Sequence, residues 1–205
     1  MQIKKLIVGG LKTNCYLIID STNVIIVDPG DDAQFIIENI EKLNLNPISI
    51  IATHGHFDHI LAIFELKLTY SISFLMHIGD DFLLKRMSSS SKHFLGFDPG
   101  PSPTVDKYLK EGDILRTHEG EIEVVETPGH TPGGICLYSK KEKFVICGDL
   151  IFSDGSVGRY DFRYSDKDVL LKSMKKVLRW DSDTLIFPGH GKEFKLREFS
   201  KVYLK

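Results

Sequence analysis

Long apolar runs are missing from this chain of 205 residues. The longest uninterrupted apolar run has five residues, as in 60–64, whereas a membrane-spanning helix needs about 20. A short apolar stretch near the N-terminus ends at Gly9 and Gly10, which is too short for the apolar centre of a secretory signal. We therefore expect a cytoplasmic protein that does not associate with membranes.

Cysteine is also scarce. The chain has only Cys15, Cys136 and Cys147, without a CxxC spacing. An odd number of cysteines without an export signal is typical of reduced thiols in the cytoplasm. Cys136 and Cys147 could face each other on a hairpin, but we expect buried free thiols.

An excess of positive charge is absent too. The 26 Lys and Arg residues nearly balance the 28 Asp and Glu residues, which gives a net charge of −2. This balance argues against a broad surface for nucleic acid or anionic membrane. The length fits a single domain over residues 1–205, built from two small halves packed as one unit. The sequence leaves the oligomeric state open.

Apolar stretches separated by turn residues predict the secondary structure. Strands are expected at 2–8, 15–20, 24–27, 48–52, 73–76, 113–116, 121–126, 134–139, 143–147 and 184–187. Helices are expected at 32–44 with Asp31 as the cap, 58–69, 79–87, 165–180 with a capping box at 165–168, and the last dozen residues. The order of strands, then a helix, occurs twice along the chain. It predicts two similar β-rich halves with helices on the outside.

The segment "SSSSKHFLGFDPGPSP" at 88–103 is rich in Ser, Gly and Pro. Such a composition predicts that it forms no regular element. It is long for a simple connector. We interpret it as a flap or a substrate-facing loop, with a disordered surface excursion as the alternative.

The segment "THGHFDH" at 53–59 places three histidines and an aspartate in seven residues. Imidazole and carboxylate are ordinary transition-metal ligands, although a polar surface loop would have the same composition. Three later segments also place a possible ligand directly after a short apolar strand, namely His130, Asp149 and His190. Loops from strand ends can converge on one edge of a sheet.

Together these segments supply more ligands than one tetrahedral ion can use. The set comprises His54, His56, Asp58, His59, His130, Asp149 and His190. It suits two ions that share one carboxylate and leave room for water. A single "PGH" or "GD" would be weak evidence, because a structural histidine or a turn aspartate would explain it.

The HxHxDH pattern with three strand-end ligands, together with "TNCYLI", "VDPG" and "FPGHG", resembles the metallo-β-lactamase superfamily of hydrolases. The resemblance covers nearly the whole chain. It implies an α+β fold, a four-layer αβ/βα sandwich in which two β-sheets are flanked by helices. The metal site is then expected at one edge of the two sheets.

The resemblance also implies roles for the ligands. The first ion would be held by His54, His56 and His130, the second by Asp58, His59 and His190, and both by a bridging Asp149. We expect Asp58 and Asp149 to be the catalytic residues. Asp28 resembles the aspartate that supports the metal loop without binding the ion; an Asp-Pro turn is the alternative. Two divalent ions are expected, with zinc first, although iron and manganese suit the same ligands.

The segment "SDGSVGRYDF" at 153–162 resembles the GRxD stretch of short glyoxalase II-like thioesterases and of persulfide dioxygenases. It suggests that Arg159 binds a substrate carboxylate, such as that of glutathione, with Asp161 in a supporting role. The alternative is an internal Arg159–Asp161 pair that only shapes the loop. Longer glyoxalase II enzymes add a C-terminal helical region for glutathione, but here only fifteen residues follow His190.

A metal-bridging hydroxide would supply a nucleophile at neutral pH. We therefore expect a metal-dependent hydrolase of small-molecule thioesters, of the hydroxyacylglutathione type. One alternative is a glutathione persulfide dioxygenase with a single iron held by His54, His130 and Asp149. Another is a phosphodiesterase, nuclease or lactonase on the same fold. Antibiotic hydrolysis is not expected, because Asp149 replaces the ligand typical of exported β-lactamases. A binding module without activity is not expected, because the ligand set is complete.

Overall fold

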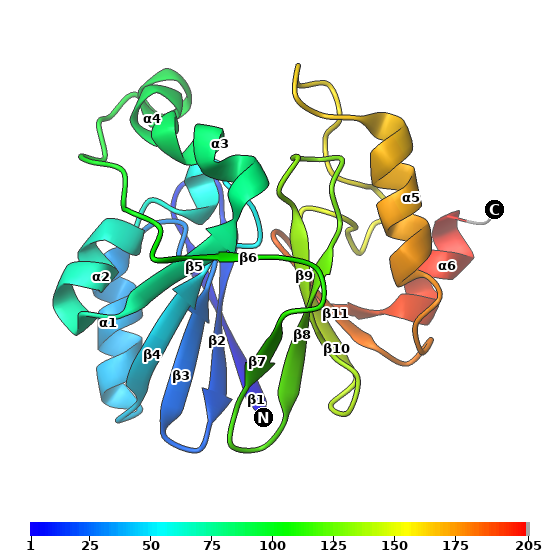
Figure 1. The fold of residues 1–205 in the computed structure, drawn as a ribbon, viewed down its shortest axis with the longest axis horizontal. Helices are drawn as coiled ribbons and strands as arrows, with labels where there is room; N and C mark the ends of the chain where they lie inside the picture. The colour runs from blue at the N-terminus through cyan, green and yellow to red at the C-terminus, as the bar shows by residue number, and fades with distance from the viewer. Residues whose placement is uncertain (204–205) are drawn as a thin grey trace.

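The computed structural model describes the backbone of residues 1–203 and the side chains of residues 1–199. Two six-stranded sheets face each other, and helices cover the outer side of each sheet (Figure 1). This arrangement confirms the predicted four-layer α+β sandwich with two halves.

The first sheet contains the N-terminal strands in chain order. They are β1 (Gln2–Val8), β2 (Thr13–Asp20), β3 (Asn23–Val27), β4 (Asn46–Ile51), β5 (Ser73–His77) and β6 (Lys107–Leu109). The pairs β1–β2 and β2–β3 are antiparallel, whereas β3 to β6 run parallel. Parallel neighbours end at the same edge of a sheet, so this edge collects the loops that follow β3, β4 and β5.

The second sheet contains the remaining strands in the order β12-β11-β10-β9-β8-β7. They are β7 (Ile114–Arg116), β8 (Glu121–Glu126), β9 (Ile135–Ser139), β10 (Phe144–Gly148), β11 (Leu185–Pro188) and β12 (Phe194–Lys195). Only β10 and β11 pair in parallel. The two-residue β12 and the three-residue β6 were not predicted.

The helices divide between the two halves. The first half has α1 (Ala33–Lys42), α2 (Ile63–Tyr70), α3 (Asp81–Lys85) and α4 (Met87–Leu95), with the 3-10 turns η1 (Phe57–His59) and η2 (Ile78–Asp80). The second half has α5 (Lys167–Val177) and α6 (Leu196–Tyr203). Within the described part of the chain, no helix has the length and apolar character needed to cross a bilayer.

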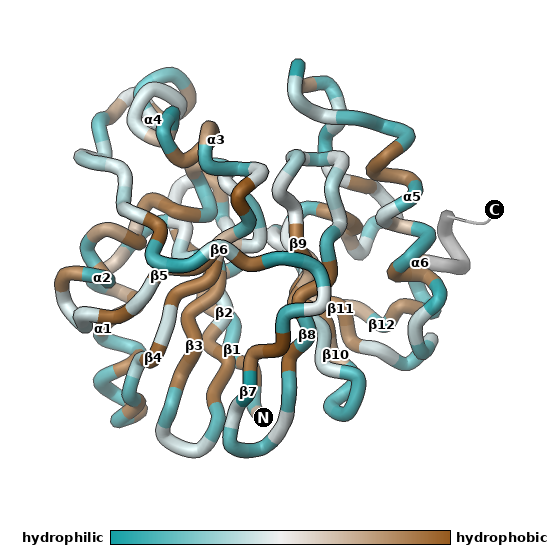
Figure 2. Tube along the Cα trace, in the orientation of Figure 1, coloured by the Kyte–Doolittle hydropathy of each residue, from teal (hydrophilic) through white to brown (hydrophobic). Residues whose placement is uncertain are grey.

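Alternation along the strands produces three apolar layers. In β2, Leu17 packs toward the helices of the first half, whereas its neighbour Ile18 packs between the two sheets. In β10, Val145 and Ile146 divide in the same way between the α5 layer and the centre. Successive side chains of a strand point to opposite faces of the sheet. Strands with apolar residues at successive positions are therefore buried on both faces. Figure 2 shows these hydrophobic strands in both sheets.

Part of the segment 88–103 is helical, which corrects the prediction that it forms no regular element. Met87 and Ser91 of α4 are buried one turn apart, and Leu95 packs against the first core. Serine costs a helix only a few tenths of a kcal/mol, and this packing outweighs that cost. Gly96, with φ 78°, ends the helix, and residues 96–106 contain no helix or strand.

Two helix caps were predicted at the wrong residue. The cap of α1 is Asp32 rather than Asp31; its side chain makes no cap bond and instead accepts a hydrogen bond of 2.8 Å from the Gly9 N–H. The cap of α5 is Asp166 rather than Ser165, because the Ser165 hydroxyl donates to the His130 carbonyl at 2.7 Å. For α5 a tertiary contact takes the side chain that sequence assigns to the cap, whereas Asp31 accepts a hydrogen bond of 2.8 Å from the neighbouring Asp32 N–H.

The cysteines follow the prediction. Cys15, Cys136 and Cys147 are buried and free. They contribute to the core as small apolar side chains.

Candidate metal centre

Four strand ends deliver the predicted ligands to one edge of the sandwich. His54 and His56 follow β4, His130 follows β8, Asp149 follows β10 and His190 follows β11. Backbone hydrogen bonds join these loops: the Ile135 N–H donates to the Thr53 carbonyl at 2.9 Å, and the Gly189 N–H donates to the Gly148 carbonyl at 2.8 Å. The loops are therefore fixed relative to one another by the backbone.

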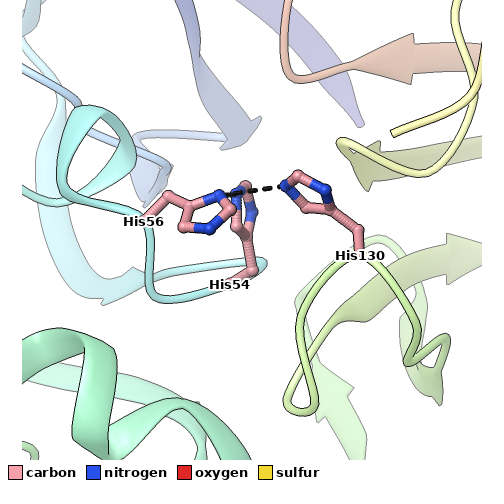
Figure 3. A group of neighbouring side chains, drawn as sticks. All are labelled: His54, His56 and His130. Carbon is pink, nitrogen blue, oxygen red and sulfur yellow. Dashed lines mark hydrogen bonds between the residues drawn. The ribbon is translucent and has the colours of Figure 1, made fainter. Parts of the chain in front are cut away.

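Three imidazoles form the first group of possible ligands. His56 Nδ1 lies 3.1 Å from His54 Nε2 and 3.0 Å from His130 Nε2 (Figure 3). Ligand atoms about 2.0–2.2 Å from one ion lie roughly 3–4 Å from each other. The three nitrogens therefore have the spacing of a shared cation.

The outer nitrogen of each imidazole in this group has its own partner. His130 Nδ1 lies 2.7 Å from the Arg159 carbonyl, and His56 Nε2 lies 2.9 Å from the Tyr164 hydroxyl. His54 Nδ1 lies 3.1 Å from the Thr53 hydroxyl. Such outer contacts fix the tautomer and leave the inner nitrogen free as a ligand. Sequence reasoning missed Tyr164, because it lies 108 residues from His56.

Asp58, His59 and His190 form the second group. Asp58 Oδ2 lies 3.3 Å from His190 Nε2 and 3.8 Å from His59 Nε2. Asp58 and His59 lie on the 3-10 turn η1, which follows the loop of His54 and His56, and the His59 ring centre is 4.2 Å from that of His54. The structure therefore divides the HxHxDH segment between the two groups, as the resemblance implies.

Asp149 lies between the groups. Its Oδ2 is 3.7 Å from His130 Nε2 and 3.8 Å from His190 Nε2, and its Oδ1 is 3.7 Å from His59 Nε2. Within the part of the chain described with side chains, the buried atoms Asp149 Oδ1 and His59 Nε2 have no hydrogen-bond partner. Buried polar atoms without partners point to an ion or water between them, so these residues fit a dinuclear centre bridged by Asp149.

Asp28 supports the loop from behind. Its buried carboxylate accepts hydrogen bonds of 2.7 Å from both the N–H and the hydroxyl of Thr53, and lies 3.0 Å from His59 Nδ1. Asp28 is also close enough to His54 and His59 to form a third possible ligand group. Its oxygens already have these partners, however, so the supporting position suits it better.

The two groups differ in charge. Burial lowers the pKa of His54 and His56, and neighbouring imidazoles lower it further, so both rings are neutral at pH 7 and available as ligands. Burial would also lower the pKa of His59, but Asp58 and Asp28 raise it to about 10. Burial would raise the pKa of Asp58, but His59 holds it below its usual range. The carboxylates of Asp58 and Asp28 thus favour a positive charge at the second group.

Asp80 is a further site residue that the sequence did not reveal. Its fully buried carboxylate accepts hydrogen bonds from the Gly55 N–H at 2.8 Å and the Gly133 N–H at 2.6 Å. Gly55 lies between His54 and His56. A signal did exist, because Asp80 follows β5 just as the ligands follow their strands.

Arg159 and Asp161 form the internal pair that the sequence left as an alternative. Arg159 Nε and Nη2 donate to the two Asp161 oxygens at 3.0 and 2.9 Å, and its guanidinium carbon lies 4.4 Å from the centre of the Phe162 ring. Binding of a substrate carboxylate by Arg159 stays a prediction.

Gly189 allows the close approach of the loops. A Cβ atom at this position would lie 2.2 Å from Asp149 Oδ1 and 2.7 Å from His59 Cε1. Any side chain here would push the Asp149 carboxylate away. Gly189, the first glycine of "PGHG", is therefore required because no Cβ atom fits between Asp149 and His59.

Comparison with known proteins gives a consistent result. The family model described as Metallo-beta-lactamase superfamily matches residues 8–190. Hydroxyacylglutathione hydrolase GloC of Haemophilus influenzae is 34% identical over 200 residues, which cover 93% of this chain and 91% of that protein.

Two solved structures are similar over nearly the whole chain. BLEG-1 B3 metallo-beta-lactamase has a TM-score of 0.90 and 30% identity, and the match covers 98% of this chain and 97% of that one. TTHA1623 in a di-iron-bound form has a TM-score of 0.88 and 30% identity, covering 97% and 96%.

Proposed function

The chain belongs to the metallo-beta-lactamase superfamily, and we propose that it is a metal-dependent hydrolase of thioesters of the hydroxyacylglutathione type. We further propose that residues 1–205 form a single domain of this fold and hold two divalent cations. Similarity to hydroxyacylglutathione hydrolase GloC supports the substrate class.

The observation that carries the proposal is the position of Asp149 between two complete ligand groups. His54, His56 and His130 would hold one cation, and Asp58, His59 and His190 the other. The unpartnered Asp149 Oδ1 and His59 Nε2 support this assignment. When bound, two divalent cations supply hydroxide at neutral pH and polarise the carbonyl under attack.

The residues of the chain itself contribute orientation. The Arg159 carbonyl and the Tyr164 hydroxyl hold His130 and His56 from outside the centre. Asp28 holds the Thr53 backbone and His59 together. These contacts fix the ligand side chains before any substrate arrives, which is the form of preorganisation that lowers a reaction barrier.

The dioxygenase alternative is supported less well. It needs one iron on His54, His130 and Asp149, without His56. Yet His56 Nδ1 lies closer to His130 Nε2, at 3.0 Å, than Asp149 does, at 3.7 Å. This geometry favours a group of three imidazoles over two imidazoles and a carboxylate.

The test is an assay of protein purified without added metal. We expect metal content near two ions per chain and hydrolysis of a glutathione thioester that a chelator abolishes and a divalent cation restores. Asp149→Asn should lose the activity, whereas the exposed Asp154→Asn in the following loop should keep it. Hydrolysis of a β-lactam alone, or oxygen uptake with a persulfide alone, would contradict the proposal. The β-lactam belongs in the assay because BLEG-1 is named as a metallo-beta-lactamase.

A further inference from the structure

A cleft of about 500 Å³ lies beside the proposed metal centre and reaches His56, His130 and Asp149. This volume is in the range of small-molecule sites. The cleft runs between α3 and α4 on one side and the loop after β10 on the other. Its lining therefore determines which substrate group can lie next to the reacting bond.

Apolar side chains form both walls of the cleft. They include Leu11, Phe57, Leu83, Phe94, Phe152 and Phe162. Phe94 of α4 is 59% exposed, although it stacks on Phe57 with ring centres 5.6 Å apart and an interplanar angle of 5°. On the opposite wall, Phe162 stacks on Tyr164 at 5.2 Å and 9°. Exposed aromatic surface on two facing walls offers a place for a flat apolar group.

Positive charge in the cleft is already paired. Among the described residues that line it, Arg159 is the one side chain with a permanent positive charge. Its guanidinium makes two hydrogen bonds to Asp161 and lies over Phe162. Asp58 and Asp149 on the floor belong to the proposed metal centre. Apart from that centre, the cleft therefore offers no unpaired cationic side chain to a substrate carboxylate.

We infer that this cleft takes the acyl half of the thioester, and that the acyl group, beyond the hydroxyl of a hydroxyacyl thioester, is uncharged, apolar and of aromatic size. The inference rests on the proposed function, in which the thiol half is glutathione or a similar thiol. Glutathione carries carboxylates and an ammonium group, so it is not complementary to apolar walls with a paired arginine. The apolar half of the substrate must then occupy the cleft, and the thiol leaves toward solvent.

The test compares acyl groups on one thiol. Acetyl, isobutyryl and phenylacetyl thioesters of glutathione are hydrolysed by the metal-loaded wild-type protein, and kcat/KM is measured for each. An apolar pocket discriminates by about tenfold or more for a group of this size. We expect the phenylacetyl thioester to exceed the acetyl thioester by that factor.

Two variants test whether Phe94 causes the preference for the phenylacetyl thioester. Phe94→Ala should reduce the ratio of phenylacetyl to acetyl kcat/KM to near one. Phe35→Ala removes a similarly exposed phenylalanine of α1, and it should leave the ratio unchanged. Metal content and the far-UV spectrum of each variant show that both remain folded and loaded.

The outcomes separate the two claims. If the acetyl and phenylacetyl thioesters are hydrolysed equally well, or if Phe94→Ala keeps the preference, the acyl assignment is wrong while the thioesterase proposal stands. If no thioester is hydrolysed, the proposed function fails first, and the inference falls with it.

Discussion

The Asp80 carboxylate accepts a hydrogen bond of 2.6 Å from the Gly133 N–H, although Asp80 follows β5 of the first sheet and Gly133 precedes β9 of the second. Its other oxygen accepts the Gly55 N–H at 2.8 Å. One buried side chain thus joins the loop of His54 and His56 to the loop of His130. The distance between these histidines depends on that connection.

Asp80→Asn should therefore weaken metal binding. An amide offers only one oxygen, so its N–H group would face one of the two backbone N–H donors. Outer partners of metal ligands typically change affinity about 10–100-fold, and we expect a loss in that range, measured by competition with a chromogenic chelator. Asp81→Asn is the matched control, because Asp81 points to Lys85 and Tyr108. Equal chelator competition in Asp80→Asn and wild type would show that the connection does not position the histidines.

Asp149→Ala should lower the occupancy of both cations while the fold persists. The side chain contacts ligands of both groups but belongs to none of the three apolar clusters. We expect a loss of affinity larger than the roughly 10–100-fold typical of outer partners. Metal analysis after dialysis and circular dichroism measure the two effects. A variant that keeps two ions and the full hydrolytic rate would rule out the bridging role.

Gly189→Ala should disturb the centre through space alone. The added methyl group would meet Asp149 Oδ1 at 2.2 Å and His59 Cε1 at 2.7 Å. We expect loss of metal from the purified protein. Gly10→Ala adds the same methyl group where nothing lies within 4 Å, so it should keep its metal. If both variants retain wild-type metal content, the loop around Gly189 is more pliable than its packing indicates.

Arg159→Ala should lower kcat/KM of charged and neutral thioesters by the same factor. Arg159 is engaged by Asp161, and its carbonyl contacts His130, so its side chain shapes the loop. Because Arg159 and Asp161 are 63% and 64% exposed, the pair should contribute little to the free energy of unfolding. Asp161→Ala should lower kcat/KM of charged and neutral thioesters by the same factor as Arg159→Ala does. A loss confined to glutathione thioesters would instead assign Arg159 to a substrate carboxylate.

Much of the centre could be read from short stretches of sequence. His54, His56, Asp58 and His59 are adjacent in the chain, and the other ligands each follow an apolar strand. Which side chains can bind metal, and that they sit at strand ends, are local properties. The alternation of apolar residues likewise determined the two sheets and most of the helices.

Other features depend on contacts between distant residues. The helical state of α4 depends on packing of Met87 and Leu95 against the first core, which outweighs the turn-like composition of the segment. Ser165 likewise lost its predicted role as a helix cap to a contact with the His130 carbonyl. Propensity is a weak preference that tertiary packing overrides.

The sequence by itself determined the ligand types, their spacing and the fold that carries them, because these are set by neighbouring residues. Only the tertiary structure decided that Tyr164 meets His56 across 108 residues and that the buried Asp80 joins the two loops. Each of these contacts forms where two sheets pack together. A side chain meets its partner there only after both halves have folded, so nothing in its own stretch of chain specifies the contact.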